Sequence, residues 1–148
     1  MIPNVDELKA GRTLAEVQGF TEELGAAVAS LASREAGTGD LEVARGILEG
    51  LVVTNPRDAL AWALLSQVER LRGDPFTALL CAGAAAQLSP EARQVRLVRA
   101  EALLAVPSEA GVGGATRREV ARGDLESLQA GTDGVARRAG ALLRALGP

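Results

Sequence analysis

Four residue types recur 34 positions apart in the middle of this chain of 148 residues. The matched pairs are Gly39 and Gly73, Asp40 and Asp74, Ala44 and Ala78, and Pro56 and Pro90. A fixed period of this size indicates that the chain contains copies of one supersecondary unit, each of which buries its apolar face against the next. The repeat therefore restricts the possible folds more than any other feature of the sequence.

The repeated residues have conformational roles that predict a pair of helices in each copy. Glycine adopts the left-handed conformation that ends a helix, and the aspartate after it accepts hydrogen bonds from the free N–H groups of the next helix. Proline stops the second helix, and the small alanine lets the two helices approach closely. This period, with two helices in each copy, is that of the tetratricopeptide repeat. The expected fold is all-α, a tetratricopeptide-like superhelix of about three helix pairs.

The second copy shows the pattern most clearly. Trp62, Leu65 and Ser66 occupy the large, large and small positions of its first helix. We expect its two helices at 57–71 and 74–87. Trp62 is interpreted as filling the space between the paired helices, rather than as an exposed aromatic that binds a peptide.

The third copy departs from the period. Apolar residues recur at helical spacing from about Glu91, but a glycine-rich loop at 107–115 replaces the expected tight turn. This loop delays the second helix of the copy to about 116–129. A last helix, at about 132–146, is apolar on one face and is expected to cap the stack of helix pairs.

A front segment precedes the repeats and belongs to none of them. Asn4 and Thr13 are suited to cap one or two short helices that end near Gly19. The segment is amphipathic, so it must fold back on the stack or pair with another chain. The expected division of this single domain is an N-terminal segment at 1–20, repeats at 21–56, 57–90 and 91–130, and a capping helix at 131–148.

Composition argues against several partners and compartments. Sixteen basic and nineteen acidic residues give a net charge of −3, which provides no electrostatic attraction for nucleic acid. Cys81 lies in an apolar run and reads as a small core residue, which suits a reducing cytoplasm. The longest apolar run, 78–86, is about half of the roughly 20 residues that a membrane span requires, and the N-terminus lacks a secretory signal pattern. We expect a cytoplasmic protein without a membrane span or a nucleic-acid partner.

The chain contains no histidine, which removes the usual general base, the commonest metal ligand and the standard partner of a serine or cysteine nucleophile. Acid–base chemistry would have to use neighbouring carboxylates. The candidate pairs are Glu22 with Glu23, Glu35 with Asp40, and Glu42 with Glu49. We interpret these pairs, and the arginine pairs at 117–118 and 137–138, as solvated surface charges. The sequence thus predicts no catalytic residue, metal or cofactor.

The inner surface of the superhelix remains as the candidate site. Stacked helix pairs curve, and the first helix of each pair lines an extended concave groove. The repeat register assigns the following residues to this groove: Ala29, Ser33, Leu60, Ala63, Leu64, Gln67, Arg70, Leu97, Val98, Glu101 and Leu104. A groove of Ala, Leu and Val with a few polar groups suits an extended peptide that has small apolar anchors. The alternative is that the N-terminal segment or a second copy of the chain covers some of these side chains.

Four short segments occur in a distinctive order along nearly the whole chain. They are Gly-Arg-Thr-Leu at 11–14, Phe-Thr-Glu-Glu at 20–23, Gly-Asp-Leu-Glu-Val-Ala at 39–44 and the final helix at 134–143. This order, around three tetratricopeptide pairs, resembles the translocator chaperones of bacterial type III secretion systems.

The resemblance implies a cytoplasmic chaperone that binds pore-forming translocator proteins before their secretion. It implies that a short stretch of the translocator lies in the groove, at Leu60, Ala63, Leu64, Gln67, Leu97 and Glu101. It also implies a homodimer supported by the N-terminal segment, with Leu14, Val17, Phe20 and Leu24 at or near the interface. Grooves of this family usually carry several Tyr and Phe residues, whereas this chain has no Tyr and two Phe.

Two other functions are compatible with the same scaffold. A structural adaptor would join two components of an assembly, and it would retain a folded partner where a chaperone prefers an unfolded segment. An enzyme would depend on one of the acidic pairs and would lose activity when one carboxylate is changed.

Overall fold

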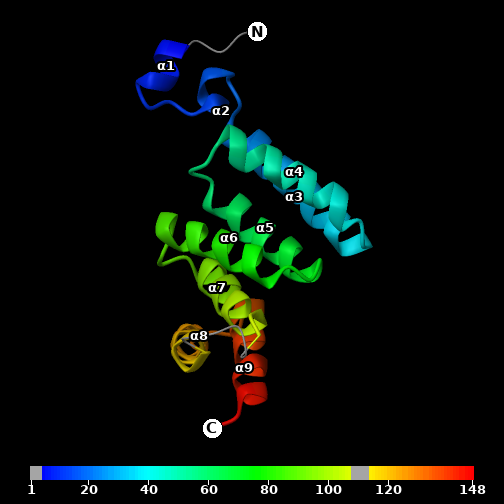
Figure 1. Ribbon diagram of the computed structural model, residues 1–148, viewed down its shortest axis with the longest axis vertical. Coiled ribbons are helices and arrows are strands. Elements are labelled where there is room, and N and C mark those ends of the chain that lie inside the picture. The colour runs from blue at the N-terminus through cyan, green and yellow to red at the C-terminus, as the bar shows by residue number, and fades with distance from the viewer. Residues whose placement is uncertain (1–4, 108–113) are drawn as a thin grey trace.

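The computed structural model describes residues 5–107 and 114–148, and within these ranges the chain forms helices and no strand. Figure 1 shows the helices following one another along the long axis. Their bounds are α1 Val5–Lys9, α2 Leu14–Val17, α3 Glu22–Thr38, α4 Leu41–Thr54, α5 Ala59–Leu71, α6 Pro75–Leu88, α7 Arg93–Ala105, α8 Gly114–Leu128 and α9 Gly134–Leu146. The all-α prediction is confirmed.

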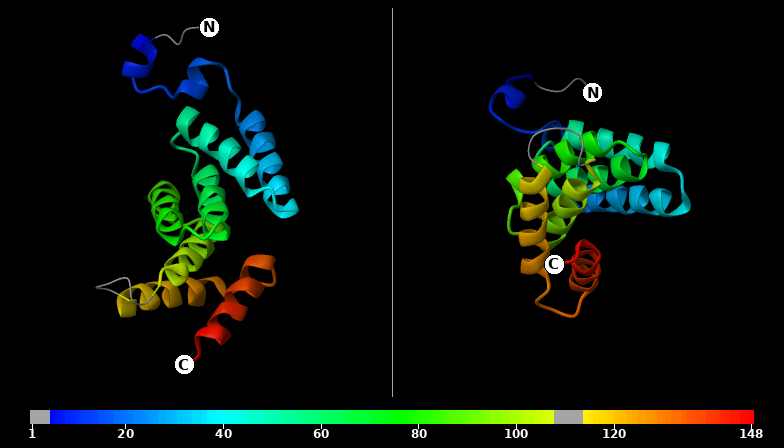
Figure 2. Two further views of the ribbon diagram at one scale, coloured as in Figure 1. Left: turned by 45° about the vertical axis from the view of Figure 1, so that its right-hand side comes forward. Right: turned by 60° about the horizontal axis from the view of Figure 1, so that its bottom comes forward.

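Three helix pairs, α3–α4, α5–α6 and α7–α8, make up the body of the molecule, and each pair packs against the next. The second helix of one pair contacts the first helix of the following pair, as α4 contacts α5 and α6 contacts α7. The last helix, α9, packs on α7 and α8 at the end of the stack opposite α1 and α2 (Figure 2). This arrangement is the one that repeat stacking requires, because each pair buries its apolar face against its neighbour.

The turns inside the first two pairs have the same geometry. Gly39 and Gly73 have φ values of +93° and +87°, in the left-handed region that favours glycine. The side chain of Asp40 accepts a hydrogen bond from the N–H of the third residue of α4, at 3.2 Å, and that of Asp74 does the same in α6, at 3.0 Å. Each turn thus ends one helix and starts the next with the residues that repeat in the sequence.

Small residues lie where the paired helices approach most closely. Ala44 and Ala78 are fully buried, and so are Ala32, Ser66 and Ala100, which occupy the same repeat position in the three first helices. In the second pair the hydroxyl of Ser66 donates to the backbone oxygen of Ala78 at 2.7 Å. The buried hydroxyl therefore has a partner, and the two helices are joined by a hydrogen bond as well as by packing.

The core consists of three apolar clusters along the stack, the first between α3, α4 and α5 with one residue of α6, the second between α5, α6 and α7, and the third between α7, α8 and α9. Trp62 is partly buried and packs against both the first and the second cluster. Its indole N–H donates to the carbonyl of Pro56 at 2.8 Å. Arg96, at the same position of the next repeat, makes the equivalent bond to the carbonyl of Pro90 at 3.0 Å. Trp62 thus has the predicted packing role, but it joins neighbouring helix pairs and does not fill only the space between the two helices of its own pair.

Cys81 lies in the first cluster and is buried, in agreement with its interpretation as a small core residue. Burial, with smaller contributions from nearby carboxylates, raises the pKa of its thiol to about 11. The thiol is therefore protonated at neutral pH and is a poor nucleophile.

Part of the N-terminal segment packs on the stack through α2, whereas α1 contacts α2 alone among the described helices. Thr13 caps α2, and its backbone N–H donates to the Glu16 carboxylate at 2.7 Å, which completes a capping box. Helix α2 packs on α4, and the guanidinium of Arg57 donates to the carbonyl of Gly11 at 2.6 Å. Leu14, Val17 and Phe20 are half-buried and Leu24 is exposed. Their participation in a homodimer stays a prediction, and the cap predicted at position 4 lies outside the described residues.

The third pair differs from the other two at its ends. Ala92 occupies the cap position before α7 and its side chain makes no hydrogen bond there. Its counterpart in the preceding repeat, Asp58, caps α5 by accepting a hydrogen bond from the N–H of Ala61. Helix α8 begins at 114, two residues before its predicted start, and most of the predicted glycine-rich loop, 108–113, lies outside the described residues. The division of the chain into repeat units at 56, 90 and 130 stays a prediction.

Candidate functional site

The inner face of the stack is formed by the first helix of each pair, with α9 in the next position. Helix α3 packs against α5, α5 against α7, and α7 against α9. In the middle of this row α5 exposes Leu60 (47%) and Leu71 (55%), with Leu64 and Gln67 half-buried between them. Spacings of four, three and four residues place these four side chains on one face of the helix. We call them the α5 stripe.

The residues predicted to line the groove fall into two groups. Exposed or half-buried are Ser33, Leu60, Leu64, Gln67, Arg70 and Leu104. Buried are Ala29, Ala63, Leu97, Val98 and Glu101. Ala63 and Val98 belong to the second cluster, so their side chains contact neighbouring helices. Contact between the accessible group and a client stays a prediction.

Helix α9 covers part of α7. Leu97 lies in the third cluster, and Leu104 packs against that cluster together with apolar side chains of α9. The amphipathic α9 buries its apolar face there, as a capping helix must. The accessible part of the inner face is therefore concentrated on α3 and α5.

One carboxylate bridges three helices of the inner row. Glu101 on α7 accepts from Arg138 on α9 at 2.7 Å and lies 3.5 Å from Arg70 on α5. The sequence indicated that Arg138 is a solvated surface charge, but its guanidinium, although half exposed, is held by a buried partner. Arg138 thus helps to fix α9 against α7.

Two further buried acids escaped the sequence analysis. Glu69, 1% exposed, accepts from Arg45 and Arg72 at 2.7 Å each. Asp124 makes a two-pronged pair with Arg99, at 2.7 and 2.5 Å. Helical periodicity contains a signal for Glu69, because it falls four residues after the core residue Leu65 and so lies on the buried face of α5.

Members of two of the three candidate carboxylate pairs have structural partners. Glu42 binds Arg72 and Glu49 binds Arg45, while Asp40 caps α4. Among the described residues no group of three or more His, Cys, Asp and Glu side chains is placed to hold a metal ion.

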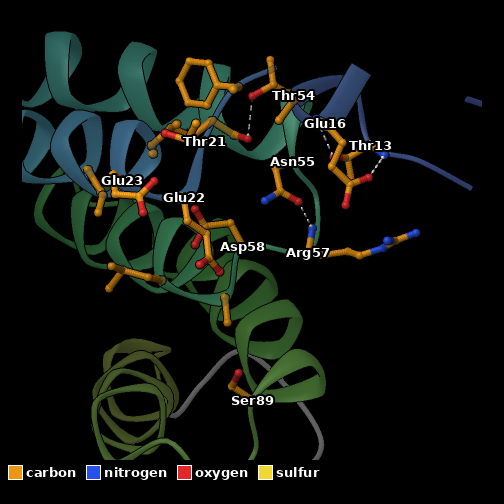
Figure 3. Close-up of a pocket in the computed structure, with 18 residues that line it drawn as sticks. Thr13, Glu16, Thr21, Glu22, Glu23, Thr54, Asn55, Arg57, Asp58 and Ser89 are labelled. Atoms are coloured by element: carbon orange, nitrogen blue, oxygen red, sulfur yellow. Dashed lines mark hydrogen bonds between the residues drawn. The ribbon is translucent and has the colours of Figure 1, made fainter. Parts of the chain in front are cut away.

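A cleft of about 810 Å³ lies at the end of the inner face next to the N-terminal segment (Figure 3). It is formed by α2, the start of α3, the end of α4 and the start of α5. Its apolar lining includes Phe20, Ala26, Leu51 and Leu60. Sequence reasoning did not find this cleft, because it is assembled from segments that are far apart in the chain. Through Leu60 the cleft is continuous with the α5 stripe.

The polar lining of the cleft is acidic. It includes Glu16, Glu22, Glu23 and Asp58, with Arg57 as the cation. A hydrogen bond from the backbone of Thr13 lowers the pKa of Glu16, and one from its own backbone N–H lowers that of Glu23. Glu16 and Glu23 therefore stay ionised at neutral pH.

In the part of the chain that the structure describes, no helix is both long enough and apolar enough to cross a membrane. No model of a known protein family matches the sequence, and no curated protein matches it.

Solved structures do match the fold. The type III secretion translocator chaperone SycD of Yersinia enterocolitica has a TM-score of 0.71 at 18% identity, over 90% of this chain and 98% of SycD. A type III secretion complex from Aeromonas hydrophila has a TM-score of 0.71 at 20% identity, over 96% of this chain and 93% of the other. PcrH, solved with the chaperone-binding region of PopD, has a TM-score of 0.65 at 22% identity, over 86% and 94%. The chain therefore has the tetratricopeptide-like helical fold of the type III secretion translocator chaperones.

Proposed function

We propose that this protein is a cytoplasmic chaperone that holds a segment of a secreted translocator on its inner face before type III secretion. The observation that carries the proposal is the match in fold to SycD over nearly the full length of both chains. The complex of PcrH with a region of PopD supports a polypeptide client. Such a role is one of binding rather than catalysis.

The α5 stripe is the part of the inner face best suited to the client. Leu60 and Leu71 are exposed, Leu64 is partly buried against the first cluster, and the other side of α5 is anchored in two clusters. Apolar side chains of an extended segment gain about 25 cal/mol for each Å² of apolar surface that they bury. The buried alanines beneath the stripe keep the helices close and the surface rigid, which reduces the ordering cost of binding.

The N-terminal segment offers a second surface, which we assign to a homodimer. Leu24 is exposed at the start of α3, and Leu14, Val17 and Phe20 are half-buried beside it in the sequence. Pairing with a second copy would remove this apolar surface from water. Sedimentation of Leu24→Glu against the unmodified protein tests the assignment, which fails if both have the same mass in solution.

Co-expression with candidate translocators from the same genomic neighbourhood tests the proposed function. We expect a true client to co-purify and to become soluble. Leu64→Glu should weaken its binding about tenfold or more, because it places a charge where apolar contact is needed, and should leave the helix content unchanged. Leu80→Glu is the matched control, because Leu80 is 75% exposed on α6, the outer helix of the same pair.

The two variants also separate the chaperone from a structural adaptor. Helix α6 has no charged residue, and it exposes Phe76, Leu80 and Leu88 on its outer side, which favours a second contact surface. Loss of binding in Leu80→Glu with full binding in Leu64→Glu would point to the adaptor. Failure of every candidate translocator to co-purify would reject the chaperone.

A further inference from the structure

The acidic cleft is the end of the surface that we assign to the client. Leu60 belongs to the α5 stripe and also lines the cleft, and Ala26 and Ala29 of α3 continue the apolar floor. An extended segment that lies on the stripe and continues toward the N-terminal segment must therefore pass the cleft. Its volume, about 810 Å³, is within the range of about 300–1,000 Å³ that is usual for ligand sites.

Three carboxylates of this cleft differ from the buried acids of the stack. Glu69, Glu101 and Asp124 each have an arginine partner. Within residues 5–107 and 114–148, Glu22, Glu23 and Asp58 form no ion pair with a lysine or arginine of the chain. No lysine or arginine among the described residues thus neutralises these three carboxylates by an ion pair.

Arg57 does not supply that cation. Its guanidinium donates to the carbonyl of Gly11 at 2.6 Å, and in Figure 3 its side chain runs away from Glu22 and Asp58. Arg57 interacts electrostatically with another acid of the cleft, Glu16, whose carboxylate already accepts a hydrogen bond from the backbone N–H of Thr13. One carboxylate oxygen of Asp58 accepts a hydrogen bond from the N–H of Ala61 at 3.0 Å. Its second oxygen can accept a hydrogen bond from a client.

We propose that the cleft receives a lysine or arginine side chain of the bound client segment. The aliphatic part of such a side chain would lie on the floor formed by Ala26 and Leu60, and its charged end would lie among Glu22, Glu23 and Asp58. Long basic side chains combine these two properties, and complementary charge fixes the register of a bound chain. The inference rests on the proposed function, because it describes how the same surface selects its client.

A random-sequence peptide library displayed on phage tests the inference with the intact protein. Selection against the immobilised protein should enrich peptides with a basic residue at one fixed position among apolar ones. In a peptide synthesised from the selection, replacing that basic residue by glutamine should weaken binding about tenfold at low salt. The difference should shrink between about 50 mM and about 500 mM salt, because salt screens exposed charges.

The double variant Glu22→Gln/Asp58→Asn should reduce the preference for the basic peptide to less than about threefold. Asparagine keeps the cap of α5, so the fold is retained, which circular dichroism checks. The double variant Glu119→Gln/Glu126→Gln makes the same change in net charge on exposed positions of α8 and should keep the full preference.

Two results would overturn the inference while leaving the proposed function in place. One is enrichment of apolar peptides without a basic position, and the other is an unchanged preference in Glu22→Gln/Asp58→Asn. If the protein enriches no peptide at all, and no translocator co-purifies, the proposed function fails and the inference fails with it.

Discussion

The first and second helix pairs both have glutamate at one repeat position, but the two side chains differ in burial and in ion pairing. Glu35 and Glu69 are equivalent in the repeat, near the ends of α3 and α5. Glu35 is half-buried and forms no ion pair among the described residues, whereas Glu69 is almost fully buried between two arginines. One of these arginines, Arg45, comes from the preceding pair. Among the described residues no repeat helix pair precedes the first one, and no arginine takes the place beside Glu35 that Arg45 has beside Glu69.

This comparison shows that a repeat position does not determine its own environment. The neighbouring repeat supplies the arginine and the apolar surface that bury the carboxylate, as expected where stability depends on contacts between adjacent units. The geometry of the turns does not depend on the neighbouring repeat, because glycine and aspartate act on backbone groups within a few residues. Equivalent substitutions in the two turns should therefore cost similar unfolding free energy. Equivalent substitutions at contacts between neighbouring pairs should cost different amounts.

The largest expected effect comes from Ala44→Arg and Ala78→Arg. Both alanines are fully buried at close helix contacts, so a long charged side chain there both overpacks the contact and buries a charge. We expect each variant to lose about 3 kcal/mol or more of unfolding free energy, measured by urea titration. Ala27→Arg, at an exposed position of α3, is the control. Unchanged stability of either core variant would contradict the repeat register.

Changes at the two glutamates test the contrast between the pairs directly. Glu69→Ala removes the partner of Arg45 and Arg72, and we expect it to cost about 2 kcal/mol of unfolding free energy. The cost stays below that of a fully buried pair because both arginines are partly solvated. Glu35→Ala should cost less than about 0.5 kcal/mol. Equal losses at the two positions would show that the preceding repeat does not set the environment of Glu69.

The turn glycines should respond alike. Gly39→Ala and Gly73→Ala put an alanine into the left-handed conformation, and each should lose about 1 kcal/mol of unfolding free energy. No atom lies within 4 Å of the added Cβ at either site, so the cost comes from the backbone alone. Gly46→Ala, inside α4 and equally free of contacts, should instead be neutral or stabilising. A large difference between the two turn variants would break their equivalence.

The smallest expected effect concerns pH. Hydrogen bonds from the hydroxyl and the backbone N–H of Thr77 lower the pKa of Asp74 below its usual value of 3.8. The unfolded chain therefore binds the proton more tightly, so the stabilisation is present above pH 3.8 and is lost as the pH falls through the folded pKa. Asp74→Asn should flatten the acid side of a plot of unfolding free energy against pH. Val43 takes the place of Thr77 in the first turn and has no hydroxyl, so Asp40→Asn is the matched control. An unchanged acid limb in Asp74→Asn would contradict this linkage.

The helix ends and turns of the repeats could be predicted from the sequence. The period, the turn residues and the caps predicted the bounds of α5 and α6 to within about two residues, because each signal acts on its own helix end. The ion pair of Glu101 was not predictable from its neighbours in the sequence, since its partner Arg138 lies 37 residues away on α9. The acidic cleft was missed for the same reason, since Glu22 and Asp58 lie at the starts of different helices.

The position of Trp62 gives the molecule a built-in optical probe. The chain has one tryptophan and no tyrosine, so the near-ultraviolet emission comes almost entirely from this indole. Because the ring contacts two apolar clusters, its wavelength and intensity respond when neighbouring helix pairs separate, even if each pair keeps its helices. A fluorescence transition that precedes the loss of far-ultraviolet circular dichroism would therefore measure the cohesion between pairs apart from the stability within them.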